Sequence, residues 1–153
     1  MNLIVGRLVK FSIVEKLVAP ADYYRTWWNL EKYFETSIFL PHLQNEDPAT
    51  YSQEQKDRIL SLTNFGMFMW TEDRTIIPRE SSWFASWDSY RRLVMLRDSI
   101  DYKDDYIGLR TLDEAGKLFF YSGPGDHMHL TDSMINDQLV PLLLGQTPAP
   151  SVY

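Results

Sequence analysis

The chain has 153 residues, the size of one domain, and its 44% hydrophobic content provides a core and excludes a disordered chain. Its formal net charge is −6 and it has no basic patch, which argues against a nucleic-acid-binding surface. The absence of cysteine excludes disulfides, thiolate metal sites and a cysteine nucleophile.

The N-terminal segment is apolar, but Arg7 and Lys10 interrupt it, so it predicts no signal peptide and no membrane-spanning helix. Residues 8–18 place apolar side chains at helical spacing. The aromatic stretch 23–28 has no clear period and predicts an irregular packed segment or a lid. A short helix is expected over residues 29–36.

A proline-containing loop is expected over residues 42–50. Ser52 and the glutamine three residues later form a capping-box pattern, which predicts a helix to about Leu62 that buries Ile59 and Leu62. The continuous apolar run at 64–70 then predicts a strand that is covered on both faces.

After this strand the sequence predicts a polar loop at 71–74, a short extended piece at 75–78 and an aromatic loop at 81–88. A small strand is expected at 93–96. Residues 104–115 have a helical pattern that would turn three apolar side chains inward and end at a left-handed Gly116; the three are Ile107, Leu112 and Ala115.

A second buried strand is predicted at 117–122, followed by a loop at 123–127. Thr131 or Asp132 would begin a last helix, and Pro141 should end or kink it. Helices and strands therefore alternate, which predicts an α/β fold with two parallel strands at about 65–70 and 117–122.

Two loops carry candidate catalytic side chains. Functional residues gather at the carboxyl ends of parallel strands, where this chain presents Asp73 in one loop and His127 in the other, with His129 nearby. If the strands are neighbours, a carboxylate would orient an imidazole that acts as general base. Ordinary turn roles remain open for both residues, and Glu72 and Asp126 remain alternative acids.

The nucleophile is the weak point of this hypothesis. A serine nucleophile elbow has the pattern G-x-S-x-G, and no serine of this chain has glycine on both sides at that spacing. Ser122 precedes Gly123, but Phe120 lies two residues before it. His42 has no nearby ligand partner, so we expect no metal site, and no motif indicates a cofactor.

Several segments, in order, resemble the C-terminal region of palmitoyl-protein thioesterases, a family of lysosomal α/β-hydrolases. The resemblance covers about residues 14–145 and rests most on the block EDRTIIPRESSWF at 72–84. Further matching segments are SIFL at 37–40 with Asn45-Glu46, the strand at 65–70, YIGLRTLDEAGK at 106–117, and GDH at 125–127.

The resemblance implies the C-terminal part of an α/β-hydrolase fold and removal of long acyl chains from protein cysteines. It assigns the triad acid to Asp73 and the triad histidine to His127 and leaves His129 as a bystander. For Trp83 and Phe84 it suggests a role in lining or supporting an acyl groove, and an ordinary role as core aromatics remains the alternative. The implied partners are S-acylated proteins or fatty-acyl thioesters, and the implied location is lysosomal or secreted.

In this family the serine elbow and the oxyanion hole lie in the N-terminal half. We therefore expect an unaligned extension at 1–12, a partial hydrolase domain at 13–146 and a disordered tail at 147–153. The isolated chain is expected to be inactive because it lacks the nucleophile. The alternative is a short, catalytically inactive product that acts as a binding or interaction module.

Overall fold

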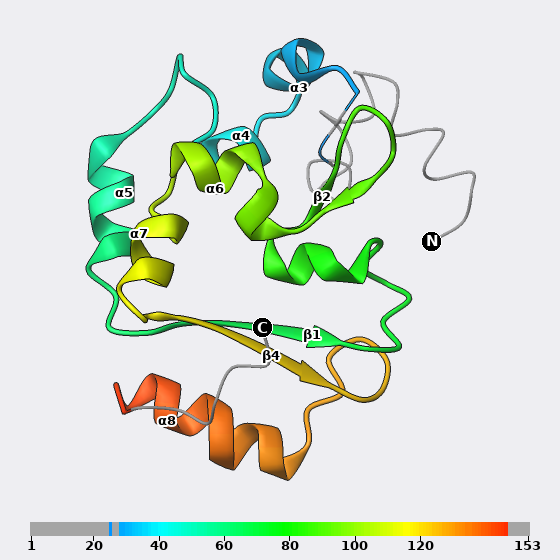
Figure 1. The fold of residues 1–153 in the computed structure, drawn as a ribbon, viewed down its shortest axis with the longest axis vertical. Helices are drawn as coiled ribbons and strands as arrows, with labels where there is room; N and C mark the ends of the chain where they lie inside the picture. Colours follow the sequence, from blue (N-terminus) through cyan, green and yellow to red (C-terminus); the bar gives the residue numbers. More distant parts are fainter. Residues whose placement is uncertain (1–24, 26–27, 147–153) are drawn as a thin grey trace.

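The computed structural model describes Arg25 and residues 28–146 (Figure 1). The helix predicted at 8–18, the extension at 1–12 and the tail at 147–153 lie outside the described residues, as does most of the aromatic stretch 23–28.

Short helices and short strands alternate along the described chain (Figure 1). The α-helices are α3 (Leu30–Thr36), α4 (Leu40–Leu43), α5 (Gln53–Leu60), α6 (Ile100–Asp104), α7 (Leu109–Glu114) and α8 (Val140–Leu143). Tighter or wider helical turns form the 3-10 segments η2 (Arg79–Trp83) and η3 (Leu96–Asp98) and the π-helical segment η4 (Met134–Leu139). The strands are β1 (Phe65–Trp70), β2 (Ser86–Trp87), β3 (Leu93–Val94) and β4 (Leu118–Gly123).

The two long strands pair in parallel, as the sequence predicted. Phe65 of β1 lies opposite Leu118 of β4, and Trp70 lies opposite Gly123. The crossover between them contains α6, α7 and the antiparallel pair β2–β3. This register brings the carboxyl ends of β1 and β4 side by side, so the loops that follow them leave the sheet together.

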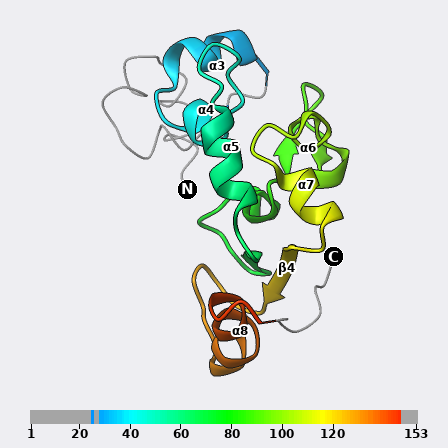
Figure 2. The ribbon, with the colours of Figure 1, turned by 90° about the vertical axis from the view of Figure 1, so that its left-hand side faces the viewer.

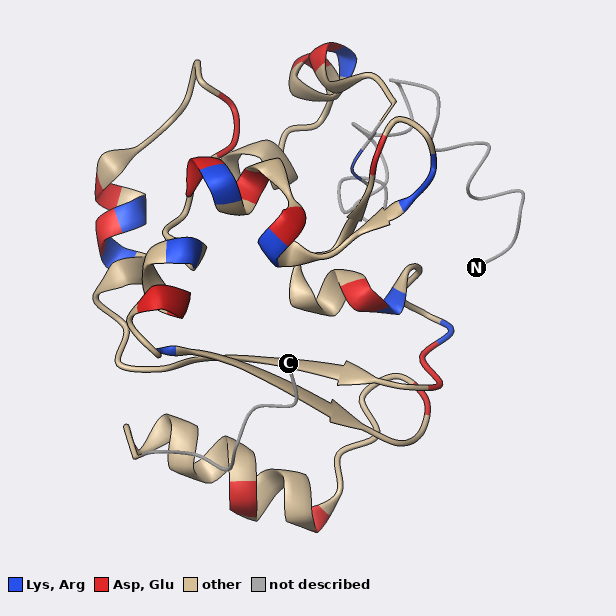
Figure 3. Ribbon diagram, in the orientation of Figure 1, with Lys and Arg blue, Asp and Glu red and all other residues tan. Residues whose placement is uncertain are grey.

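Both faces of the β1–β4 sheet are covered. In Figure 2, α8 lies on one side of β4, and α5, α6 and α7 lie on the other. The strands themselves carry no charged residue, and Figure 3 shows the charges on the helices and loops around them. The core includes side chains from both strands and from the crossover; its most buried apolar members are Leu96, Leu112, Phe120 and Leu109. The prediction of doubly covered strands is confirmed.

Two predicted helix starts are confirmed by their caps. The Asn29 side chain accepts a hydrogen bond from Lys32 N at 3.0 Å, and Ser52 Oγ accepts one from Gln55 N at 3.3 Å. The Gln55 side chain binds the carbonyl oxygens of His42 and Leu43 and so ties α5 to α4.

The start of the loop predicted at 42–50 was wrong, since α4 includes His42 and Leu43. Leu62 was predicted to be buried, but α5 ends at Leu60 and Leu62 is exposed. Residues 75–78 form bends rather than an extended piece, and 81–88 is divided between η2 and β2.

The continuous helix predicted at 104–115 is also wrong, because the chain leaves helical geometry at Asp105 (φ 56°) and Gly108 (φ 89°). The Asp105 carboxylate instead accepts hydrogen bonds from Arg110 N and Thr111 N and caps α7, and it pairs with Lys56 Nζ at 2.9 Å.

The predictions for the end of α7 and for the last helix are confirmed only in part. Ala115 is exposed rather than inward, but Gly116 has the predicted positive φ of 66°. Thr131 Oγ1 accepts a hydrogen bond from Met134 N at 3.2 Å and so supports the start of the last helix. Pro141 does not end that helix, which passes from π to α geometry and continues to Leu143.

A partly buried ionic cluster joins Arg25, α3, the loop after α4 and α6. The Arg25 guanidinium binds Glu46 Oε2 at 2.7 Å and Asp101 Oδ1 at 3.1 Å, and Tyr33 Oη donates to Glu46 Oε1 at 2.8 Å. Burial raises the pKa of the Glu46 carboxyl and outweighs the opposing effect of Arg25.

Among the described residues, 25 and 28–146, none of the helices has the length and hydropathy of a membrane-spanning segment.

Candidate active site

Backbone hydrogen bonds join the loops that follow β1 and β4. Thr71 N donates to Gly123 O at 2.9 Å, and Glu72 N donates to Gly125 O at 3.0 Å. These two hydrogen bonds continue the pairing of β1 and β4 into the loops beyond the sheet. The next residues on the two sides are therefore held in a fixed register, and they include both predicted catalytic side chains.

Asp73 and His127 come together at this point. Asp73 Oδ2 lies 2.8 Å from His127 Nδ1, which is within hydrogen-bond distance. The Asp73 side chain is only 1% exposed, whereas that of His127 is 37% exposed. One partner is thus fixed in the protein, and the other reaches solvent.

The second oxygen of Asp73 anchors the carboxylate to its own loop. Oδ1 accepts hydrogen bonds from Thr75 N at 2.8 Å and Ile76 N at 3.0 Å. Burial by itself would raise the pKa of the Asp73 carboxyl, but the N–H groups of Ile76 and Thr75 and the His127 ring together hold it below its ordinary value. Asp73 is therefore an anion at neutral pH.

The charge of Asp73 determines the tautomer of its partner. A carboxylate can only accept a hydrogen bond, so His127 Nδ1 carries the proton in this contact. In the neutral ring, Nε2 then has a free lone pair and can accept a proton from another group. The arrangement has the chemical capacity of an oriented general base.

Trp70 and His129 pack around the histidine loop. The Trp70 ring meets the His127 ring edge-on with centroids 6.3 Å apart, and Trp70 Nε1 donates to His129 O at 2.8 Å. His129 thus contributes its backbone to the loop, and its exposed ring lies beside Gly125. Of the two histidines, His127 is the one that meets Asp73.

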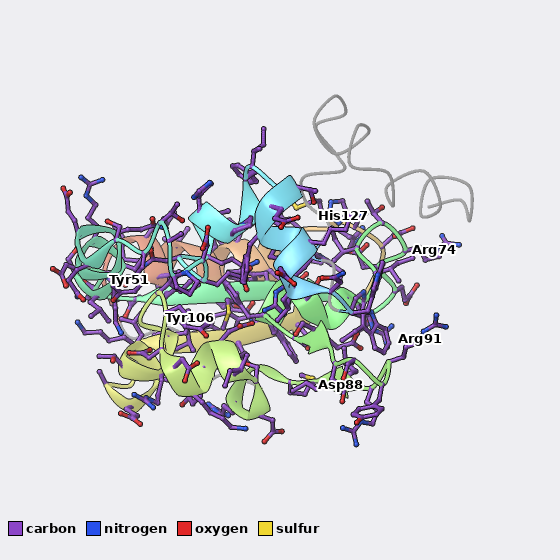
Figure 4. The ribbon with its side chains drawn as sticks, turned by 90° about the horizontal axis from the view of Figure 1, so that it is seen from above. Tyr51, Arg74, Asp88, Arg91, Tyr106 and His127 are labelled. Atoms are coloured by element: carbon purple, nitrogen blue, oxygen red, sulfur yellow. The ribbon has the colours of Figure 1, made fainter. Side chains whose placement is uncertain are left out.

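The two alternative acids have other surroundings. Glu72 is exposed and contributes its backbone N–H to the loop pairing. Asp126 accepts from Arg74 Nη2 at 3.0 Å and from the backbone N–H groups of Arg74 and His127. Figure 4 shows Arg74 and His127 near one end of the molecule, with Tyr51 at the other. From the sequence, Asp126 was only an alternative acid, and its position directly before His127 was the one signal for these loop contacts.

Trp83 and Phe84 lie apart from the Asp73–His127 contact. Trp83 is buried in the core, where Nε1 donates to Tyr121 O at 3.1 Å. The Phe84 ring packs against Phe65, at the opposite end of β1 from Asp73. Phe84 also lines a cavity of about 10 Å³, the space of roughly one water molecule.

A larger cavity, of about 310 Å³, lies between β2, β3 and α6 and is bordered by Arg25 and Asp101. Neither cavity borders Asp73 or His127. Hydrogen-bond geometry, rather than a hollow in the described surface, therefore identifies the candidate site. No group of three or more His, Asp or Glu side chains suited to a metal ion occurs in the described part of the chain.

Comparison with known proteins finds similar sequences over most of the chain. A family model described as palmitoyl protein thioesterase matches residues 1–127. Palmitoyl-protein thioesterase 3 of Dictyostelium discoideum is 33% identical over 126 residues, which are 81% of this chain and 43% of that protein. Palmitoyl-protein thioesterase 1 of Caenorhabditis elegans is 30% identical over 83% of this chain and 43% of its own length.

A lysosomal thioesterase of Xenopus laevis is 34% identical over 72% of this chain and 38% of its own length. The chain thus spans less than half the length of these three curated relatives.

Proposed function

The chain belongs to the palmitoyl-protein thioesterase family, and we propose that it supplies the acid and the histidine of a fatty-acyl thioester hydrolase. The observation that carries this proposal is the 2.8 Å contact between Asp73 Oδ2 and His127 Nδ1 at the carboxyl ends of two parallel strands.

In this proposal Asp73 holds the imidazole and stabilises its protonated form. His127 Nε2 takes the proton of a serine hydroxyl as the serine oxygen attacks the thioester carbonyl carbon. The carbon–sulfur bond then breaks, and His127 returns the proton to the leaving thiolate. Water releases the fatty acid from the serine through the same base, which restores both groups.

The serine of such an enzyme lies in a nucleophile elbow, and these 153 residues contain no such motif. No serine in this sequence has the glycines of a nucleophile elbow. We propose that the chain on its own forms no acyl-enzyme, and that turnover requires a polypeptide that also carries the elbow and the oxyanion hole.

The names of the relatives support a proposal for the substrate and the location. Palmitoyl-protein thioesterases of two species and a lysosomal thioesterase of a third match this chain, so we propose S-acylated proteins or fatty-acyl thioesters as substrates and the lysosome as the location. Trp83 is buried in the core and Phe84 borders a water-sized cavity, so we propose that both support the fold and do not contact the acyl chain.

A hybrid enzyme tests the proposal. The part of the Dictyostelium thioesterase that matches this chain is replaced by this chain's residues, and hydrolysis of a palmitoyl thioester is measured. We expect activity from the hybrid and none from the 153-residue chain alone. A hybrid that melts cooperatively but does not hydrolyse the thioester would count against the proposal.

The missing elbow also favours a second candidate function, in which the chain binds acylated proteins without turnover. An S-palmitoylated peptide that binds the isolated chain, while its unacylated form does not, would support this function.

A further inference from the structure

Two neighbouring side-chain contacts join the two loops of the candidate site. Asp73 contacts the His127 side chain, and the neighbour of each, Arg74 and Asp126, contact one another. We propose that Asp126 is a positioning residue that holds His127 against Asp73, an inference that rests on the function proposed above.

The Asp126 carboxylate binds the backbone of both loops. Its Oδ1 accepts from His127 N at 2.8 Å and from Arg74 N at 3.2 Å. Its Oδ2 accepts from Arg74 Nη2 at 3.0 Å. One side chain thus fixes the backbone of the catalytic histidine relative to the residue that follows the catalytic acid.

The hydrogen bond from Arg74 N to Asp126 Oδ1 lies just past the last backbone hydrogen bond between the two loops. The pairing reaches Glu72 N and Gly125 O, and the Asp126 carboxylate provides the next connection between the two loops. Met128, beyond His127, has a positive φ of 59° as the chain turns away. The position of the histidine therefore depends on the carboxylate immediately before it.

Support for the His127 backbone matters because the side chain is partly exposed to solvent. It is 37% exposed, and its ring meets the Trp70 ring edge-on with centroids 6.3 Å apart. A displacement of about 1 Å would break the hydrogen bond to Asp73 and lower catalysis strongly. Hydrogen bonds from His127 N and from Arg74 hold the pKa of Asp126 below its ordinary value, so its charge is present at neutral pH.

We attribute the positioning of His127 to the backbone hydrogen bonds of Asp126 and not to its ion pair with Arg74. The Arg74 side chain is 85% exposed, and exposed ion pairs contribute little. The two bonds to backbone N–H groups do not depend on that side chain. This separates three variants: Asp126→Ala loses all the contacts, Arg74→Gln loses only the ion pair, and Asp126→Asn keeps one oxygen for the backbone.

The test is nitrogen NMR of the histidine rings in the 153-residue chain at about pH 8, where histidine is ordinarily neutral. In the unmodified chain we expect His127 to carry its proton on Nδ1. Asp126→Ala should lower the ratio of this tautomer to the other by about tenfold, as for loss of one charge-assisted hydrogen bond. Arg74→Gln should leave the ratio unchanged, and Asp126→Asn should restore most of it.

The melting temperature of each variant is measured alongside. An Asp126→Ala chain that melts earlier but keeps the tautomer ratio of the unmodified chain would show a purely structural role and overturn the inference. If that variant does not fold, Asp126→Glu replaces it, because the longer side chain keeps the charge and misplaces the oxygens. An unchanged ratio there overturns the inference equally.

The same spectra separate this inference from its premise. An unmodified chain whose His127 carries its proton on Nε2 would contradict both the role of Asp73 and that of Asp126. A normal ratio that survives every Asp126 substitution would contradict the positioning role alone.

Discussion

Asp73 and His127, which are 54 residues apart in the chain, meet at 2.8 Å because β1 and β4 are neighbouring parallel strands. The carboxylate partner is buried, and the imidazole partner is 37% exposed. This division suits an imidazole that must hold one nitrogen still while the other faces a reacting group.

Replacing Asp73 should change the pH dependence of stability. The native pKa of Asp73 lies below that of the unfolded chain, so its ionised form stabilises the fold above the unfolded value and this contribution is lost as pH falls through the native pKa. Asp73→Asn should lower the free energy of unfolding by about 1–3 kcal/mol at neutral pH, with the difference shrinking in acid.

Denaturant unfolding at about pH 7 and at about pH 3, on either side of the ordinary aspartate pKa, measures this effect. Glu72→Gln, at the exposed neighbouring carboxylate, is the matched control and should change stability by less than about 0.5 kcal/mol. An Asp73→Asn deficit of the same size at both pH values would contradict the account.

Gly125 should tolerate a side chain poorly. It has a φ of 99°, and a β-carbon there would lie 2.9 Å from the His129 ring. Gly116 also has a positive φ, of 66°, but a β-carbon there would meet open space. Gly116→Ala should cost about 1–2 kcal/mol from backbone strain alone, and Gly125→Ala should cost more. Equal losses in denaturant unfolding would mean that the His129 contact has no consequence.

Gly66 of β1 permits the close approach of α8. A methyl group at Gly66 would overlap the Leu142 side chain. Gly66→Ala should destabilise the fold, and a large part of the loss should disappear when Leu142 is also replaced by alanine. We expect an interaction energy of about 0.5–3 kcal/mol from a double-mutant cycle. The cycle with Leu144→Ala, an exposed neighbour on the same helix end, should be additive; additivity with Leu142 as well would contradict the packing.

The isolated chain should not react as a serine hydrolase. We expect no labelling by a serine-directed fluorophosphonate probe and no release of thiol from a palmitoyl thioester, because no elbow serine is present in these 153 residues. A full-length relative serves as the positive control. Labelling that competes with the thioester would locate a nucleophile that the sequence pattern does not reveal.

Local sequence predicted the parts of this fold whose causes are local. The apolar runs that became β1 and β4, the helix start near residue 29 and the cap at Ser52 depend on neighbouring residues only. The break before α7 does not. Asp105 adopts a positive φ and pairs with Lys56, 49 residues earlier, and a helical apolar pattern gives no sign of such a partner.

The candidate site divides in the same way. The carboxyl-end rule pointed to the loops of Asp73 and His127, but it required the two strands to be neighbours, which is a property of the whole topology. The contacts of Asp126 could not be predicted, because its partner Arg74 lies 52 residues away in sequence. Its task is visible only when both loops are in place.

The most direct test of the central claim compares three variants in the hybrid enzyme. Asp73→Asn and His127→Gln should each lower kcat for palmitoyl-thioester hydrolysis by about 10³- to 10⁴-fold, as expected for loss of one member of a catalytic triad. His129→Gln, two residues away, should leave kcat within about twofold of the unmodified hybrid, since His129 contributes its backbone to the loop. Equal losses at His127 and His129, or a hybrid that keeps its activity without the Asp73 carboxylate, would contradict the account.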